Sequence, residues 1–104
     1  MTNTARKGNA AEVYVAHNLK DKGFVVASRR HIGGAGDLLA IRPDGKVWLV
    51  EVKACKSLWG NFTRADRQEM RDTPLPEGAE RWVANVRGTG DNRTILWVGE
   101  GAWP

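Results

Sequence analysis

The stretch that most constrains this chain is the hydrophobic run from Val47 to Lys53, whose second half carries an acid and a base. A run this apolar is typical of a strand in the interior of a sheet. Because strand side chains alternate between the two faces, Glu51 and Lys53 point to one side and Trp48 to the other. A carboxylate and an ammonium there are costly unless they pair or the carboxylate binds a cation. The run therefore predicts either a salt bridge or a functional site.

Length, charge and cysteine content narrow the classes of protein. The chain has 104 residues and a mass of 11.5 kDa, which fits a single domain, residues 1–104, with one core. Its 16 lysines and arginines against 12 acids give a net charge of +4, which favours a polyanionic partner. A single cysteine, Cys55, excludes an internal disulfide and a cysteine-rich zinc site. With no apolar run of signal or membrane type, we expect a soluble protein of the cytoplasm.

The first segment predicts a helix from about Thr4 to Lys22, closed by Gly23. Its apolar positions, among them Val15 and Leu19, follow Glu12 at helical spacing, so this acid lies at the end of the buried stripe. Three interpretations remain open. Glu12 belongs to a capping box that starts the helix late, at residues 9–12, or is a first-turn acid that complements the helix dipole, or faces the same site as Glu51.

The next residues predict two further strands. Residues 24–30 have the composition of a strand that becomes basic at its end, and residues 31–36 form a glycine-rich connection. This loop lacks the lysine of a P-loop and the strand-to-helix context of a dinucleotide site, so both nucleotide-binding readings are excluded. Residues 37–42 form a second hydrophobic strand, and residues 43–46 a hairpin turn into the central strand. Asp37 should therefore lie near Glu51 and Lys53.

The remaining sequence predicts one helix and two strands. Residues 54–61 are expected to form a loop. Thr63, with Asp66 three residues on, is the expected N-cap of a helix that runs to about Asp72. A polar stripe follows this helix, which is either a solvated face or part of a functional surface. It consists of Arg64, Arg67, Gln68 and Arg71. Residues 81–86 and 94–98 are expected to be strands that complete the sheet.

The five tryptophans exceed what one small core needs. We expect Trp48 and Trp82 in the core. Trp59 and Trp103 are candidates for a dimer contact or for base stacking, although filling a core gap is the commoner role of tryptophan. Cys55 has no recognisable catalytic partners and is expected to be a passive thiol.

The order helix, three strands, helix, two strands, with Asp37 followed across a hairpin by Glu51-Val52-Lys53, resembles the PD-(D/E)xK nuclease superfamily. Within it, residues 7–12, the strand start at Gly23, the Arg29-Arg30 pair and residues 51–54 are similar to archaeal and phage Holliday junction resolvases. The resemblance spans residues 7 to about 71. It implies an α/β restriction-endonuclease-like core with a mixed central sheet flanked by helices. One difference is Gly36, because the family usually has proline before the first acid.

The resemblance also implies the site. Asp37, Glu51 and Glu12, with Val52, would hold Mg²⁺, for which Mn²⁺ can substitute, and Lys53 would contact the reacting phosphate or water. Gln68 would be the helix residue that assists. Hard oxygen ligands suit these ions, and phosphodiester hydrolysis needs the charge that they supply. The alternative is a purely structural Glu51–Lys53 pair at a solvated sheet edge.

The implied activity is Mg²⁺-dependent, structure-selective cleavage of four-way DNA junctions by a homodimer, in a prokaryotic or phage-infected cell. Cationic residues are expected to hold phosphates without reading bases. The expected DNA-binding residues are Lys7, Arg29, Arg30, His31, Lys56, Arg64, Arg67 and Arg71. A less selective phage or repair nuclease of the same core and a catalytically silent DNA-binding module are the alternatives.

Overall fold

The computed structural model describes residues 3–29 and 35–104, with side chains from residue 9 onward. Helix α1 spans Asn3–Asp21 and is followed by β1 (Val25–Ser28), β2 (Leu38–Ile41) and β3 (Val47–Lys53). The elements after β3 are α2 (Leu58–Asn61), α3 (Arg64–Asp72), β4 (Glu80–Arg87), η2 (Gly90–Asn92), β5 (Thr94–Gly99) and η3 (Glu100–Ala102).

The strands form one sheet of five strands in the order β1-β2-β3-β4-β5, with β3 in the centre. Neighbouring strands are antiparallel except for β3 and β4, which are parallel and are connected through α2 and α3. The predicted α/β fold with a mixed central sheet is therefore confirmed. The central position of β3 contradicts the alternative that placed the Glu51–Lys53 pair at a sheet edge.

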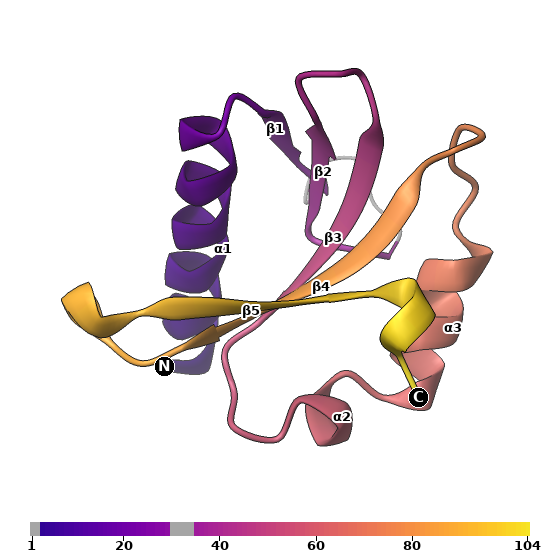
Figure 1. Ribbon diagram of the computed structural model, residues 1–104. Helices are drawn as coiled ribbons and strands as arrows, with labels where there is room; N and C mark the ends of the chain where they lie inside the picture. The colour runs from indigo at the N-terminus through magenta and orange to yellow at the C-terminus, as the bar shows by residue number, and fades with distance from the viewer. Residues whose placement is uncertain (1–2, 30–34) are drawn as a thin grey trace.

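The two faces of the sheet carry separate cores, and Figure 1 shows α1 and α3 on opposite sides of the strands. Val15 and Leu19 of α1 pack on the face that Val50 and Val52 present. On the other face, Leu49 and Val83 pack against Phe62, Met70 and Trp103. The alternation of side chains along β3 thus decides which residues meet α1 and which meet α3.

The predicted N-terminus is confirmed for α3 but not for α1. The capping box of α3 is present in both directions, since the Thr63 side chain accepts from the Asp66 backbone and Asp66 accepts from the Thr63 backbone. In contrast, α1 already begins at Asn3, so Asn9 lies inside the helix and cannot be its N-cap. The late-start interpretation of Glu12 is therefore wrong.

Residues 58–61, expected to be loop, form the one-turn helix α2. The turn is closed by the hydrogen bond from the Phe62 N–H to the Leu58 carbonyl, and the Leu58 side chain is buried in the α3-side core. Burial of Leu58 and the hydrogen bond from Asn61 Nδ2 to the Ser57 carbonyl at 2.7 Å hold this turn, which is too short to show a helical period in the sequence.

Four of the tryptophans are packed. Trp48 lies 4.8 Å from Trp82 and 5.8 Å from Trp97, centroid to centroid, on the α1 side. Trp103, a candidate for a dimer contact or base stacking, is instead buried, with its ring edge-on to Phe62 at 4.9 Å and its Nε1–H donating to the Val98 carbonyl. Trp59 on α2 remains exposed. Among the helices of residues 3–29 and 35–104, none is long and apolar enough to cross a membrane.

Candidate functional site

Asp37 lies immediately before β2 and is held against β3 by its backbone and its side chain. Its N–H donates to the Val50 carbonyl at 2.8 Å, and its carboxylate Oδ2 accepts from the Val52 N–H, also at 2.8 Å. The short hairpin between β2 and β3 fixes this register. The expected proximity of Asp37 to the Glu51-Val52-Lys53 segment is therefore present in the structure.

Gly36 sets the backbone direction that delivers Asp37 to this position. Its φ is +87°, and a Cβ there would lie 2.6 Å from Leu49 Cδ1. Glycine is the residue that adopts this conformation without strain, whereas proline is fixed near −65° and could not. Where the resembled family usually has proline, this chain thus has a glycine whose backbone conformation lets it pack tightly against Leu49.

Glu51 and Lys53 face the α3 side of the sheet and form an ion pair of 3.3 Å between Lys53 Nζ and Glu51 Oε2. The Glu51 side chain is only 17% exposed. Burial, the largest cause, and the nearby charge of Asp37 together raise the pKa of Glu51 to about 7, although Lys53 acts in the opposite direction. Two acids this close in a half-buried position favour a cation beside them.

The donor set fits a hard divalent cation. The Asp37 and Glu51 carboxylates supply oxygen ligands. Val52, which follows Glu51 on β3, can offer its backbone carbonyl oxygen. Within the described part of the chain, no group of three or more His, Cys, Asp or Glu side chains gathers closely enough to hold a metal ion. The fit therefore rests on two carboxylates and on backbone oxygen.

Glu12 is on α1, the helix that covers the opposite face of β3 from Glu51. It is half-buried and lines a groove between α1 and the first two strands, together with Asn9, Ser28 and Leu38. Leu38 follows Asp37 directly, so this groove leads toward the acid from the other side of the sheet. Glu12 is not gathered with Asp37 and Glu51 into one three-acid cluster.

The expected phosphate-binding residues fall into three groups. Lys56 and Arg64 are exposed, and Arg29 is half-buried with its backbone N–H donating to the Asp37 carbonyl at 2.9 Å. Arg30, His31 and the Lys7 side chain lie outside the described residues. The remaining two, Arg67 and Arg71, are engaged within the protein.

Arg67 does not belong to a solvated polar stripe. Its residue is only 8% exposed, its guanidinium donates to the Phe62 carbonyl, and it lies over the Trp59 ring at 5.7 Å. The helical spacing with Arg64 was correct, but α2 folds back over this side of α3 and covers the side chain. Arg67 therefore stabilises the α2–α3 junction, and its burial contradicts the predicted contact with DNA phosphates.

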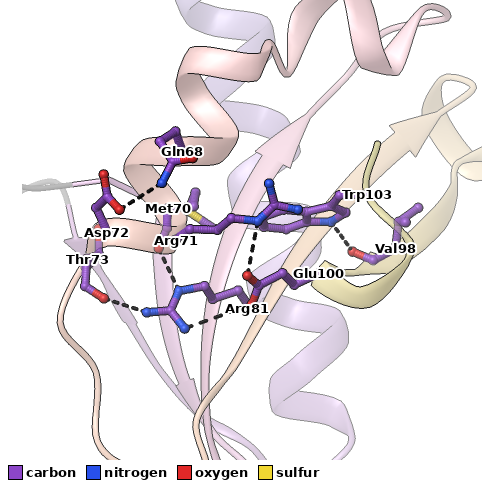
Figure 2. A network of polar contacts seen from close by, with 9 residues as sticks. All are labelled: Gln68, Met70, Arg71, Asp72, Thr73, Arg81, Val98, Glu100 and Trp103. Carbon is purple, nitrogen blue, oxygen red and sulfur yellow. Dashed lines mark hydrogen bonds and ion pairs between the residues drawn. The ribbon is translucent and has the colours of Figure 1, made fainter.

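Arg71 and Gln68 are drawn in Figure 2, where the end of α3 meets the C-terminal segment. Arg71 Nε contacts Glu100 Oε2 at 3.2 Å, and its guanidinium lies 5.5 Å from the Trp103 ring. Gln68 is exposed and donates to Asp72 along the helix at 2.8 Å. The described contacts of both residues are thus with α3 and the C-terminal turn, and none is with Glu51 or Lys53.

Arg81 completes this network, as Figure 2 shows. It donates from Nε to the Met70 carbonyl and from Nη2 to the Thr73 carbonyl, each at 2.6 Å. These carbonyls lie at the C-terminal end of α3, where the Met70 carbonyl also accepts from the Thr73 N–H at 3.4 Å. Arg81 therefore fixes the end of α3 on the sheet, a role for which no local sequence pattern exists.

Two polar residues near the site were not assigned to it from the sequence. Asp66, the capping residue of α3, adds its charge to those that raise the pKa of Glu51. Asn85 is fully buried on β4 opposite Lys53, and its Oδ1 accepts from the Cys55 N–H at 3.2 Å. Its Nδ2 has no acceptor within the described residues. The sequence signal that could have indicated Asn85 is its position as a single amide side chain within the apolar run of β4.

No family model matches the chain, and no curated protein sequence matches it. Among solved structures, the chain is similar to Hjc of Archaeoglobus fulgidus, a Holliday junction resolvase from an archaeal hyperthermophile, with a TM-score of 0.71. The two are 19% identical, and the match covers 91% of this chain and 74% of that one. At this identity the likeness concerns the fold alone: the five-stranded sheet and its helices are arranged as in that structure, in the α/β architecture that the sequence led us to expect.

Proposed function

We propose that this chain is a Mg²⁺-dependent DNA endonuclease that acts as a homodimer on four-way junctions, with Mn²⁺ able to replace Mg²⁺. The observation that carries the proposal is the meeting of Asp37, Glu51 and Lys53, with Asp37 Oδ2 bonded to the Val52 N–H at 2.8 Å and Lys53 at 3.3 Å from Glu51. The fold likeness to a resolvase supports it.

The residues divide the work of phosphodiester hydrolysis. Asp37, Glu51 and the Val52 carbonyl would hold the cation, which when bound supplies positive charge to the phosphate oxygens. The Asp37–Val52 hydrogen bond orients one carboxylate before any ligand arrives. Glu12, from the groove on the other side of the sheet, remains a proposed further participant.

Besides the metal ion, the proposed site has a positively charged catalytic side chain, Lys53. Its ammonium carries donors that can orient the attacking water or neutralise charge that develops on the phosphate. The Lys53 side chain is 25% exposed, and its ammonium is 3.3 Å from Glu51. This ion pair holds the ammonium at the site without a substrate and leaves part of it open to solvent.

The basic balance of the chain supports a polyanionic substrate, since the net charge is +4. Arg29, Lys56 and Arg64 are the described residues proposed to contact phosphates, with Lys7, Arg30 and His31 proposed from the sequence. Junction selectivity would come from the spacing of two such sites in a dimer rather than from base contacts.

The decisive experiment compares labelled four-way junction, duplex and single-stranded DNA, each incubated with the purified protein plus Mg²⁺ or plus chelator. We expect paired cuts in the junction, only with Mg²⁺. Equal cutting of duplex and junction would favour a less selective nuclease of the same fold. Binding without any cutting in Mg²⁺ or Mn²⁺ would favour a catalytically silent DNA-binding module.

A further inference from the structure

A groove of about 460 Å³ lies where the two parallel strands β3 and β4 end. Residues 54–56, which follow β3, form one wall, and residues 86–89 at the end of β4 form the other. We call this the strand-end groove. Its first lining residue, Ala54, follows Lys53 in the chain, so the groove lies close to the proposed catalytic lysine.

The charge of the strand-end groove has one sign. Lys56 and Arg87, one from each wall, are both exposed, and the described lining residues include no acid. Ala54 and Val86 provide the apolar part of the lining. A basic rim over a short apolar floor is complementary to an anionic chain, such as a nucleic-acid backbone.

The walls of the groove are tied together before any ligand binds. The buried Asn85 Oδ1 accepts from the Cys55 N–H at 3.2 Å, and Arg87 Nη2 lies 3.5 Å from the Lys56 carbonyl. Gly88 turns the second wall away at a φ of +84°, where a Cβ would lie 2.5 Å from the Asn92 carbonyl oxygen. A site preorganised in this way loses less conformational entropy when it binds.

Arg87 retains most of its hydrogen-bonding capacity. A guanidinium has about five N–H donors, and the described contact to the Lys56 carbonyl uses one of them at the long end of the hydrogen-bond range. The other donors can form the paired hydrogen bonds that arginine makes to phosphate oxygens.

We propose that the strand-end groove binds the phosphodiester backbone of the DNA strand beside the scissile phosphate, with Arg87 and Lys56 as the phosphate-binding residues. This inference rests on the proposed function, because the bound strand is that of the proposed substrate. It adds Arg87, which no sequence motif indicated, and it assigns Lys56 to a defined position.

The first test measures how DNA affinity depends on salt, by fluorescence anisotropy of a labelled four-way junction with chelator present. Arg87→Gln and Lys56→Gln should each reduce the slope of log affinity against log salt by about 0.9, and Arg87→Lys should restore it in part. The matched control is Arg42→Gln, which removes the same charge from a half-buried arginine paired with Asp44 at the opposite end of β3. Thermal melting of each variant verifies its folding.

The second test uses Cys55, the single cysteine of the chain, as a reporter within the groove. Saturating junction DNA should slow alkylation of the thiol by the uncharged reagent iodoacetamide at least severalfold, and Arg87→Gln should weaken this protection at equal DNA concentration. Because the reagent is neutral, repulsion by the DNA charge does not explain slower labelling.

The outcomes separate this inference from the proposed nuclease activity. If Arg87→Gln changes slope and protection no more than Arg42→Gln does, the strand-end groove is not a DNA site, whether or not the protein cuts. If the wild-type protein cuts no DNA but Arg87→Gln reduces the slope and Cys55 is protected, the groove stands and the nuclease proposal fails.

Discussion

The carboxylate of Asp37 accepts a 2.8 Å hydrogen bond from the backbone N–H of Val52, the residue between Glu51 and Lys53. The acid that precedes β2 is thereby attached to the middle of the segment that carries the other two charges. A shift of β2 along β3 would break this bond and move Asp37 away from Glu51 and Lys53. Any catalytic role of the site depends on the register of one hairpin.

Replacing Asp37 with Asn or Glu51 with Gln should lower Mg²⁺-dependent junction cleavage on the order of 10³-fold. Each change removes a negative charge from the proposed cation site but keeps an oxygen that can accept a hydrogen bond, so the fold and the DNA affinity in chelator should persist. Cleavage is measured by gel under single-turnover conditions and affinity by anisotropy.

Asp72→Asn is the control for these variants, because Asp72 is an exposed acid at the end of α3 that contacts Gln68. It should cut at the wild-type rate. Loss of DNA binding by the Asp37 and Glu51 variants, with cleavage per bound complex unchanged, would contradict the proposed metal role.

The stability of the metal-free protein should fall as the pH rises, because of Glu51. Its pKa is raised from 4.5 to about 7. The proton is bound more tightly in the folded state, so its stabilising contribution is complete below pH 4.5 and is lost as the pH rises through 7. The difference corresponds to about 3 kcal/mol at most.

Chemical denaturation in chelator between pH 4.5 and 8 tests this pH dependence. Because other acids also titrate, the quantity to follow is the difference in unfolding free energy between the wild type and Glu51→Gln, which should shift in favour of the variant as the pH rises. Mg²⁺ at pH 8 should stabilise the wild type more than the variant. A variant that is less stable than the wild type at every pH would favour a purely structural Glu51–Lys53 pair.

Gly36→Ala should destabilise the protein more than Gly45→Ala does. Both glycines have positive φ, +87° and +92°, so alanine pays a similar backbone cost of about 1 kcal/mol at each. A Cβ at Gly45 meets nothing within 4 Å, whereas one at Gly36 lies 2.6 Å from Leu49 Cδ1 and 3.3 Å from the Met70 sulfur. Overpacking should add about 1–3 kcal/mol at Gly36.

Denaturation of the two glycine variants side by side isolates this packing effect. Equal losses of stability would mean that Leu49 moves aside without cost. In that case the close packing of Gly36 would not hold Asp37 in place. It would then also not explain why this chain lacks the proline that the resembled family usually has before the first acid.

Local sequence patterns correctly predicted those elements whose own residues determine their bounds or pairing. The apolar run gave β3 its bounds of Val47–Lys53, the hairpin residues gave the pairing with β2, and Thr63 with Asp66 gave the start of α3. Since Asp37, Glu51 and Lys53 are brought together by a hairpin, their proximity also followed from short-range information.

What the sequence did not reveal depends on contacts between distant segments. Arg67 has the spacing of a solvated stripe, and only the position of α2 with Trp59 decides that it is buried. Arg71 is engaged by Glu100, which lies 29 residues away. The covering of Trp103 by Phe62 is likewise a tertiary effect that no helical or strand period encodes.

The proposed homodimer is tested by mass and by mixed subunits. A four-way junction has approximate two-fold symmetry and must be cut on two opposed strands, so one chain with a single Asp37–Glu51–Lys53 site cannot make both cuts at once. Two-fold association buries the same surface of each subunit, about 800 Å² per partner with an apolar centre. Trp59 and Leu96 are exposed apolar side chains available for such a surface.

Light scattering at micromolar concentration should therefore report about twice the monomer mass of 11.5 kDa. Dimers that combine a wild-type subunit with a Glu51→Ala subunit should nick one strand of the junction and release no paired products, because each site serves one strand. Mixing wild-type protein with Asp72→Asn subunits controls for subunit exchange and should leave paired cutting intact. A protein that stays monomeric with and without junction DNA would exclude junction resolution and leave a less selective nuclease, since the arrangement of Asp37, Glu51 and Lys53 is complete within one chain.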